Sequence, residues 1–233
     1  MFKNLKKHKF NVYSQNGEDG ILQYIFNKLS IKKGFAVEFG AADGIWLSNT
    51  YNLVKNGWKA VYIESDKESF SKLEELSKSK NLDIIALNKT VSPDSGKNNL
   101  NTILSKLSVP DEFELLSIDV DGLDLEIWES FLGNPIVVVI EINSGIYPGK
   151  LQNHSKQNSG ASFTSMVEIG EKKGYKVVCH TGNLIFLKKE YVNKIDISKL
   201  YLNYPNLIFD KNLNRKYKLN KLISKLKKKI LKS

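Results

Sequence analysis

Short apolar runs alternate along the chain with segments in which apolar residues recur at helical spacing. Five runs predict strands: 35–39, 59–64, 83–87, 114–120 and 135–143. Two further runs on either side of Gly182, at 175–181 and 183–189, predict a hairpin. Helical spacing predicts helices over 21–29, 48–55, 67–79, 98–107, 123–131 and 163–173. Strands alternating with helices predict an α/β fold, a mostly parallel sheet with helices on both faces and an antiparallel edge hairpin.

The segment from Phe35 to Gly44 has the pattern of a buried strand that turns sharply into a loop and then a helix. Gly40 and Gly44 would let the backbone approach a ligand closely, because glycine has no Cβ. The second predicted strand ends at Glu64, where a carboxylate could accept hydrogen bonds from both hydroxyls of a ribose. Together these features predict a nucleoside-bearing cofactor over the first two strands.

The spacing of the glycines bears on which cofactor binds. A dinucleotide site favours Gly-x-Gly-x-x-Gly, whereas this loop places Glu38 and Asp43 where a diphosphate would lie. Two carboxylates suit a cationic ligand with an amino-acid ammonium, such as S-adenosylmethionine. The segment resembles the glycine-rich first motif of class I S-adenosylmethionine-dependent methyltransferases. A Rossmann dehydrogenase that binds NAD(H) stays open as an alternative.

Polar residues gather where the other predicted strands end, and open α/β sheets bind ligands at that edge. Asp119 and Asp121 lie at the carboxyl end of the fourth predicted strand, Glu141 and Asn143 lie at that of the fifth, and His180 precedes the hairpin turn. Asp124 is interpreted as a turn or helix-cap residue. Burying an unpaired carboxylate costs several kcal/mol, so Asp119 and Glu141 are expected to have a cation or a hydrogen-bond donor as partner.

Several short motifs occur in a fixed order: Ser14–Gly20, Val37–Gly44, Asn49-Thr50, Leu116–Gly122 and Val139–Asn143. This set resembles the FkbM-like methyltransferases of bacterial polysaccharide biosynthesis, over roughly residues 11–190. The resemblance implies a Rossmann-like methyltransferase fold with a seven-stranded sheet, and methyl transfer to a sugar hydroxyl. The sugar would be nucleotide-linked or part of a capsule or surface-polysaccharide precursor. The implied cofactor-binding residues are Gln15, Glu38, Gly40, Ala41, Asp43, Gly44, Asn49, Glu64, Ser65, Thr90, Val91 and Asp119.

A sugar hydroxyl is a weak acid, so its methylation needs a general base or a metal ion that stabilises the alkoxide. One hypothesis places Mg²⁺ or Mn²⁺ on Asp119, Asp121, Glu141 and Asn143, since these ions prefer oxygen ligands. The other makes His180 the base, as a neutral imidazole suits proton removal near pH 7. The catalytic candidates are therefore Asp119, Glu141 and His180, and whether a metal takes part stays open.

The net charge of +10 belongs to one end of the chain. Residues 211–233 contain ten Lys or Arg and no acid, and the other 210 residues are neutral overall. Apolar residues at helical spacing in that tail predict a basic amphipathic helix that could contact an anionic membrane, the domain itself or a second subunit of a homodimer. The predicted domains are a basic lead-in over 1–12, one methyltransferase domain over 13–210 and this helix.

Composition bears on the partners, the compartment and the functions that this protein could have. Lysine outnumbers arginine thirty-four to one, which argues against nucleic-acid binding, where bidentate arginine contacts are favoured. One cysteine, no signal-peptide pattern and no long apolar run lead us to expect a cytoplasmic protein. Besides sugar O-methylation, two functions stay open: methylation of another small metabolite or a phosphoryl group, and a non-catalytic binding module recruited by its tail.

Overall fold

The computed structural model describes residues 3–107, 109–155, 159–216 and 218–219. The strands are β1 (Phe35–Phe39), β2 (Lys59–Glu64), β3 (Asp83–Asn88), β4 (Leu115–Ile118), β5 (Val137–Glu141), β6 (Tyr175–His180) and β7 (Asn183–Lys188). The α-helices are α1 (Glu18–Lys28), α2 (Tyr51–Lys55), α3 (Lys67–Ser77), α4 (Leu100–Ser105), α5 (Asp124–Ser130), α6 (Phe163–Lys172) and α7 (Lys199–Asn203). Short 3-10 helices are η1 (Leu5–His8), η2 (Lys189–Lys194) and η3 (Pro205–Ile208).

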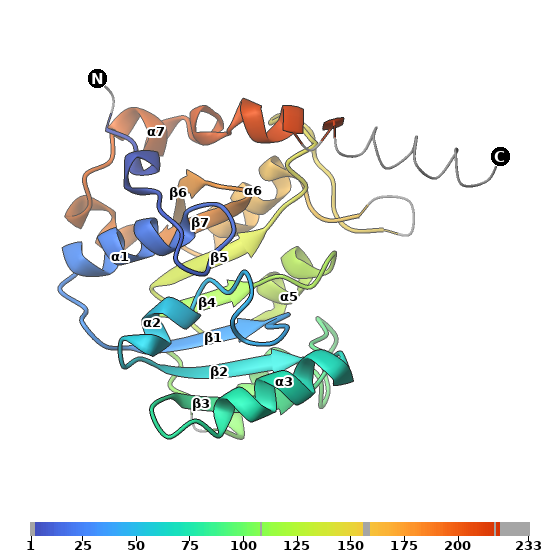
Figure 1. Ribbon diagram of the computed structural model, residues 1–233. Helices are drawn as coiled ribbons and strands as arrows, with labels where there is room; N and C mark the ends of the chain where they lie inside the picture. The colour runs from blue at the N-terminus through green and yellow to red at the C-terminus, as the bar shows by residue number, and fades with distance from the viewer. Residues whose placement is uncertain (1–2, 108, 156–158, 217, 220–233) are drawn as a thin grey trace.

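In the described part of the chain these strands form one seven-stranded sheet in the order β3-β2-β1-β4-β5-β7-β6 (Figure 1). β1 to β5 are parallel, and β7 is antiparallel to both β5 and β6. The α/β fold and its antiparallel hairpin are thus confirmed. β7 lies between β5 and β6, and β6 is the edge strand. The strand order reverses direction between β1 and β4, and a sheet of this kind binds ligands at that switch point.

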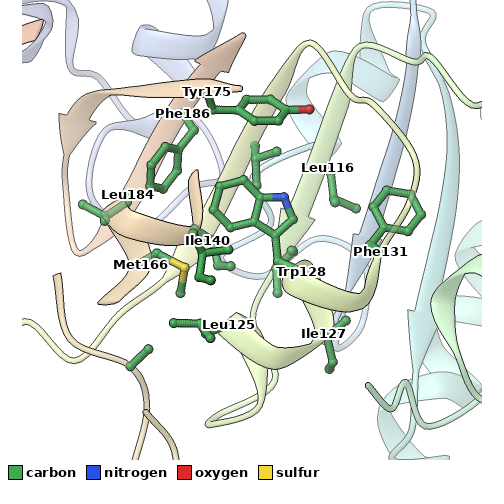
Figure 2. Packing of buried hydrophobic residues seen from close by; sticks show 14 of the residues in the cluster. Leu116, Leu125, Ile127, Trp128, Phe131, Ile140, Met166, Tyr175, Leu184 and Phe186 are labelled. Atoms are coloured by element: carbon green, nitrogen blue, oxygen red, sulfur yellow. The ribbon is translucent and has the colours of Figure 1, made fainter. Parts of the chain in front are cut away.

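Apolar residues cover both faces of the sheet, because successive side chains of a strand point to opposite sides. Val37 and Phe39 of β1 belong to the core cluster on one face, and Ala36 belongs to the cluster on the other. Figure 2 shows Trp128 of α5 packed among aromatic and aliphatic side chains on the first of these faces, including Phe186 of β7. This two-sided burial explains why the predicted strands are nearly continuous apolar runs.

The predicted boundaries agree with the structure to within a few residues for most elements. One of the differences concerns the predicted helix 48–55, because α2 begins only at Tyr51. Ser48, Asn49 and Thr50 instead form a turn whose side chains and amides bind Glu38. Polar residues here hold a loop against the sheet and do not extend the helix.

The N-terminal segment is packed against the body of the protein. Leu5 is fully buried, Lys3 pairs with Asp196 at 2.6 Å, and Lys6 pairs with Asp210 at 2.9 Å. Residues 211–216 are helical, and most of the predicted basic helix over 211–233 lies outside the described residues. The predicted boundaries near residues 12 and 210 stay predictions, as do the contacts proposed for the tail. In the described ranges no helix combines the length and the hydropathy needed to cross a bilayer.

Candidate functional site

A cleft of about 440 Å³ opens at the carboxyl ends of β1, β2, β3 and β4, at the switch point of the sheet. Its lining contains four carboxylates and one lysine, so the cleft is acidic. The lining residues are Glu38, Gly40, Ala41, Ala42, Trp46, Leu47, Ser48, Asn49, Ile63, Glu64, Ser65, Lys89, Thr90, Val91, Asp119, Val120, Asp121 and Leu123.

The loop after β1 forms one wall of the cleft. Gly40 has φ +71°, and a Cβ at this position would overlap the carbonyl oxygen of Asp119, so the close approach of β1 and β4 requires glycine. Of the predicted cofactor-binding residues in this loop, Gly40 and Ala41 line the cleft, whereas Asp43 and Gly44 do not. Asp43 Oδ1 instead accepts hydrogen bonds from the amides of Ile45 and Trp46 at 2.9 and 2.8 Å. Asp43 and Gly44 therefore belong to the loop that forms this wall, but they do not line the cleft themselves.

Glu64 lies at the tip of β2, where the sequence predicted a ribose-binding carboxylate. Its side chain is 8% exposed and accepts hydrogen bonds from the amides of Ala42 and Asp66, each at 2.7 Å. These bonds connect the β1 loop with the start of α3 and fix the carboxylate at the cleft wall. Ser65, Thr90 and Val91, also named as cofactor-binding candidates, line the same end, so the cleft extends from β1 across β2 to β3.

Glu38 lies at the floor of the cleft and is almost fully buried. Its carboxylate accepts hydrogen bonds from the hydroxyls of Ser48 and Thr50, each at 2.6 Å, and from the amide of Asn49 at 2.9 Å. Burial raises the pKa of the Glu38 carboxyl above its usual range, and these hydrogen bonds oppose the shift. Glu38 thus anchors the turn before α2 and contributes negative potential to the floor.

The same turn leaves one acceptor without a partner. Asn49 donates its side-chain Nδ2 to the hydroxyl of Ser117 at 3.1 Å, and it is 5% exposed. No donor among the described residues reaches its Oδ1 atom. Asn49 lines the cleft, but its Oδ1 atom is itself buried, so a ligand would reach this atom only if the turn shifted.

Three carboxylates meet where β4 and β5 end. Oxygen atoms of Asp119, Asp124 and Glu141 lie within 4.8 Å of one another. Desolvation in the cleft, followed by the charges of Asp124 and Asp121, raises the pKa of Asp119 to about 7. Desolvation and the adjacent Asp119 raise the pKa of Glu141 to about 8. Asp119 and Glu141 are hydrogen-bonded to each other, so near neutral pH this pair holds a proton.

The cluster differs from the predicted metal-binding set. Asp121 lines the cleft but is not part of the cluster, and Asn143 donates its side chain to Ser159 and accepts from the amide of Gly145. Asp124 takes their place, although the sequence suggested only a cap. It does accept hydrogen bonds from the amides of Val120 and Gly122, at 2.8 and 2.9 Å. Carboxylate oxygens are the ligands that Mg²⁺ and Mn²⁺ prefer, so the three side chains fit a divalent ion.

His180 is not among the residues that line the cleft. It is fully buried at the end of β6, where Nδ1 accepts from the amide of Asp210 and Nε2 lies 2.9 Å from the hydroxyl of Ser144. Its ring also stacks on Phe209. Burial first and the charge of Lys6 second lower the pKa of His180 to about 4. The structure therefore gives His180 a packing role and does not place it to act as a base.

Gln15 also lies outside the cleft, in a polar segment that braces the fold. Glu18 accepts from the hydroxyl of Thr181 at 2.6 Å, and Asp19 accepts from the amides of residues 12, 13 and 14. Ser14 forms a bridge with Leu47 of the cleft wall. The Ser14–Gly20 motif thus connects the hairpin turn to the β1 loop, without contributing a residue to the cleft lining.

Several lining residues were not named among the predicted site residues. Lys89 lies between Asn88 and Thr90, so its position after the third strand could have indicated it. Trp46 and Leu123 had no such signal, because exposure at a cleft rim leaves no pattern in a single sequence. Trp58 and Trp128 are core residues by contrast, and their burial follows from the apolar runs around them.

No protein-family model and no curated protein matches the sequence. Solved structures with a similar fold include an S-adenosylmethionine-dependent methyltransferase from Aquifex aeolicus, with 14% identity, a TM-score of 0.41 and coverage of 71% of this chain and 86% of that one. A TehB-like methyltransferase from Corynebacterium glutamicum has 12% identity, a TM-score of 0.43 and coverages of 77% and 89%. Precorrin-6y C5,15-methyltransferase from Geobacter metallireducens has 16% identity, a TM-score of 0.43 and coverages of 76% and 90%. Likenesses of this size carry no conclusion about activity, which has to come from the cleft.

Proposed function

We propose that this chain is an S-adenosylmethionine-dependent O-methyltransferase that acts on a hydroxyl of a sugar. The observation that carries the proposal is the acidic cleft at the switch point, with Glu64 at the tip of β2 and four carboxylates against one lysine. An acidic cleft attracts a sulfonium cation and an ammonium group, and it repels a diphosphate. The electrostatics thus favour this cofactor over a dinucleotide.

The residues present fit such a cofactor. Glu64 keeps free lone pairs for ribose hydroxyls while its amide contacts hold it in place. Gly40 lets the β1 loop lie close to Asp119 and presents backbone without a Cβ at the cleft wall. The sulfonium of the bound cofactor supplies an activated methyl group.

Asp119 is the proton acceptor in this proposal, because it lines the cleft and is hydrogen-bonded to Glu141. A carboxylate whose pKa is about 7 is better matched to removing a hydroxyl proton than an ordinary aspartate is. The charge of Asp124 favours the protonated form of Asp119, whereas the hydrogen bond with Glu141 favours the ionised form. As an alternative, the three carboxylates would hold Mg²⁺ or Mn²⁺, whose charge would lower the pKa of the acceptor hydroxyl.

A sugar acceptor is supported by the motif resemblance and by the polar character of the cleft near Asp119 and Asp121. A phosphoryl acceptor is disfavoured, since its negative charge would have to enter among these carboxylates. Any phosphate of a nucleotide-linked sugar would therefore lie outside the acidic part of the cleft.

The test is calorimetric titration of the full chain with S-adenosylhomocysteine, with and without Mg²⁺ or Mn²⁺. We expect micromolar binding that weakens at least tenfold in Glu64→Gln, which corresponds to losing about 1.4 kcal/mol. Glu68→Gln is the matched control, because Glu68 is exposed on α3 and lies outside the cleft. Thermal melting of both variants would show whether the loop held by Glu64 still folds.

Each result has a consequence. Binding that is lost selectively in Glu64→Gln supports the cofactor site and justifies transfer assays with labelled S-adenosylmethionine and a panel of sugars. Binding that needs Mn²⁺ and disappears in Asp124→Asn supports the metal alternative. No binding under any condition, from protein that melts cooperatively, would overturn the proposed function.

A further inference from the structure

Trp46 lies at the rim of the cleft with its indole exposed. Its side chain is 70% exposed, whereas Trp58 and Trp128 are buried to within 2%. Leu123, a second apolar residue of the lining, is 39% exposed. A large aromatic surface exposed to water is unfavourable. An exposed indole at the mouth of a cleft is therefore suited to a ligand that covers it.

The backbone around Trp46 is held in place, so the exposure does not come from a loose loop. Asp43 Oδ1 accepts from the Trp46 amide at 2.8 Å, and Glu64 Oε2 accepts from Ala42 at 2.7 Å. On the other side, Leu47 has φ +59° and forms a bridge with Ser14. A non-glycine residue in the left-handed region is strained, and it persists only where the surroundings fix it. The loop therefore presents the indole at a defined position.

Building on the proposed methyl transfer, we propose that Trp46 is a stacking platform for the pyranose ring of the acceptor. Such a ring carries C–H groups on its faces and hydroxyls around its edge, so it matches an apolar aromatic surface beside hydrogen-bond acceptors. The cleft offers this combination, with the indole of Trp46 and the carboxylates of Asp119 and Asp121 in one lining. Stacking would orient one hydroxyl toward Asp119.

Other occupants fit less well. A purely apolar acceptor would leave Asp119 and Asp121 facing a surface without donors, which is costly for polar groups removed from water. A phosphate against the indole would enter the field of four carboxylates with only Lys89 in opposition. The adenine of the cofactor is expected over β2 and β3, near Glu64 and Val91, whereas Trp46 belongs to the β1 loop.

The experiment is ¹⁹F NMR of the full chain labelled with 5-fluorotryptophan. Three signals are expected, and Trp46→Phe assigns the exposed one. The protein is first saturated with S-adenosylhomocysteine, and methyl glycosides of glucose, galactose and mannose are then added to high millimolar concentration. Sorbitol is the matched control, because it has hydroxyls but no pyranose face. We expect at least one glycoside to shift the Trp46 signal, with no shift from sorbitol and none at Trp58 or Trp128.

Three results would overturn the proposal: a Trp46 signal that moves only with S-adenosylhomocysteine, one that moves equally with sorbitol, or one that never moves. Failure of the proposed function is separate, because the same sample would then show no calorimetric binding of S-adenosylhomocysteine. With the glycoside that shifts the signal, Trp46→Ala should weaken binding about tenfold, the range of a lost aromatic contact. Trp46→Phe should weaken it less, and Leu132→Ala, exposed outside the cleft, should not change it.

Discussion

Two parts of the same sheet edge carry buried polar side chains, and they are built in opposite ways. At the ends of β1, β2 and β4 polar side chains such as Glu64 and Asp119 line an open cleft. At the end of β6 both nitrogens of His180 have partners. The Thr181 hydroxyl there donates to Glu18 of α1, and Phe209 covers the His180 ring.

The difference shows how an α/β sheet confines its chemistry to one half of an edge. Segments from both ends of the described chain close the β6 side, with Glu18 from the N-terminal part and Asp210 from the C-terminal part. A polar residue at a strand end is therefore a site residue only where no other segment covers it. The hydrogen bonds of His180 and Thr181 stabilise the closed half, and the cleft leaves the open half accessible to a ligand.

The largest effect is expected from Gly40→Ala in the open half. The added Cβ would overlap the Asp119 carbonyl, and an alanine would have to adopt φ +71°. We therefore expect a loss of about 4 kcal/mol in the free energy of unfolding. Gly174→Ala is the control, since Gly174 has φ +87° but no atom within 4 Å of the added Cβ, and should cost only about 1 kcal/mol. Urea denaturation measures both, and equal losses would contradict the close approach of β1 and β4.

The next effect concerns His180→Ala in the closed half. Removing the ring leaves the Asp210 amide without its acceptor and opens a cavity beside Phe209, so we expect a loss of about 3 kcal/mol in stability. Affinity for S-adenosylhomocysteine should stay within about twofold of the wild type, because His180 does not line the cleft. Denaturation and calorimetry on the same sample check both statements. Weaker cofactor binding with unchanged stability would place His180 in the open half after all.

A third effect separates the two halves by pH. The pKa of His180 is about 4 in the folded protein and about 6.5 when unfolded, so stability is fully present above pH 6.5 and falls as the pH drops toward 4. We expect this residue to contribute a loss of about 2 kcal/mol between pH 7.5 and pH 5. The slope of unfolding free energy against pH should be shallower in His180→Asn. Parallel slopes for both proteins would refute a buried neutral imidazole.

The smallest effect has the opposite sign and belongs to Asp119. Its pKa of about 7 lies above that of an unfolded aspartate, so its contribution is present below about pH 4 and is lost as the pH rises toward 7 and beyond. Because Asp119 is open to the cleft, solvent screening limits the change to less than about 1 kcal/mol. Asp119→Asn should remove this loss of stability with rising pH. Asp83→Asn, a substitution at an exposed residue at the start of β3, should retain it. Thermal melts from pH 5 to pH 8.5 measure the difference.

The sequence predicted the sheet well, because a strand buried on both faces has to be apolar along its length, as Val137 to Ile140 are. It also predicted the ends of β1, β2 and β4, where Gly40, Glu64 and Asp119 do line the cleft. It could not distinguish Asp119 from His180, since covering segments such as 205–214 are far away in the chain. Nor could it predict that Asp124 would join Glu141 and Asp119, because that grouping depends on how the 119–124 turn bends.

The hydrogen bond between Thr181 and Glu18 can form only late in synthesis, because the two residues are 163 positions apart. At ribosomal rates of roughly 5–20 residues per second, the N-terminal segment waits about 8 to 33 s for its partner. During that interval the apolar side of α1, with Ile21, Leu22 and Ile25, cannot pack against β6 and β7. The nascent chain therefore exposes the apolar side of α1 until the β6–β7 hairpin has been synthesised.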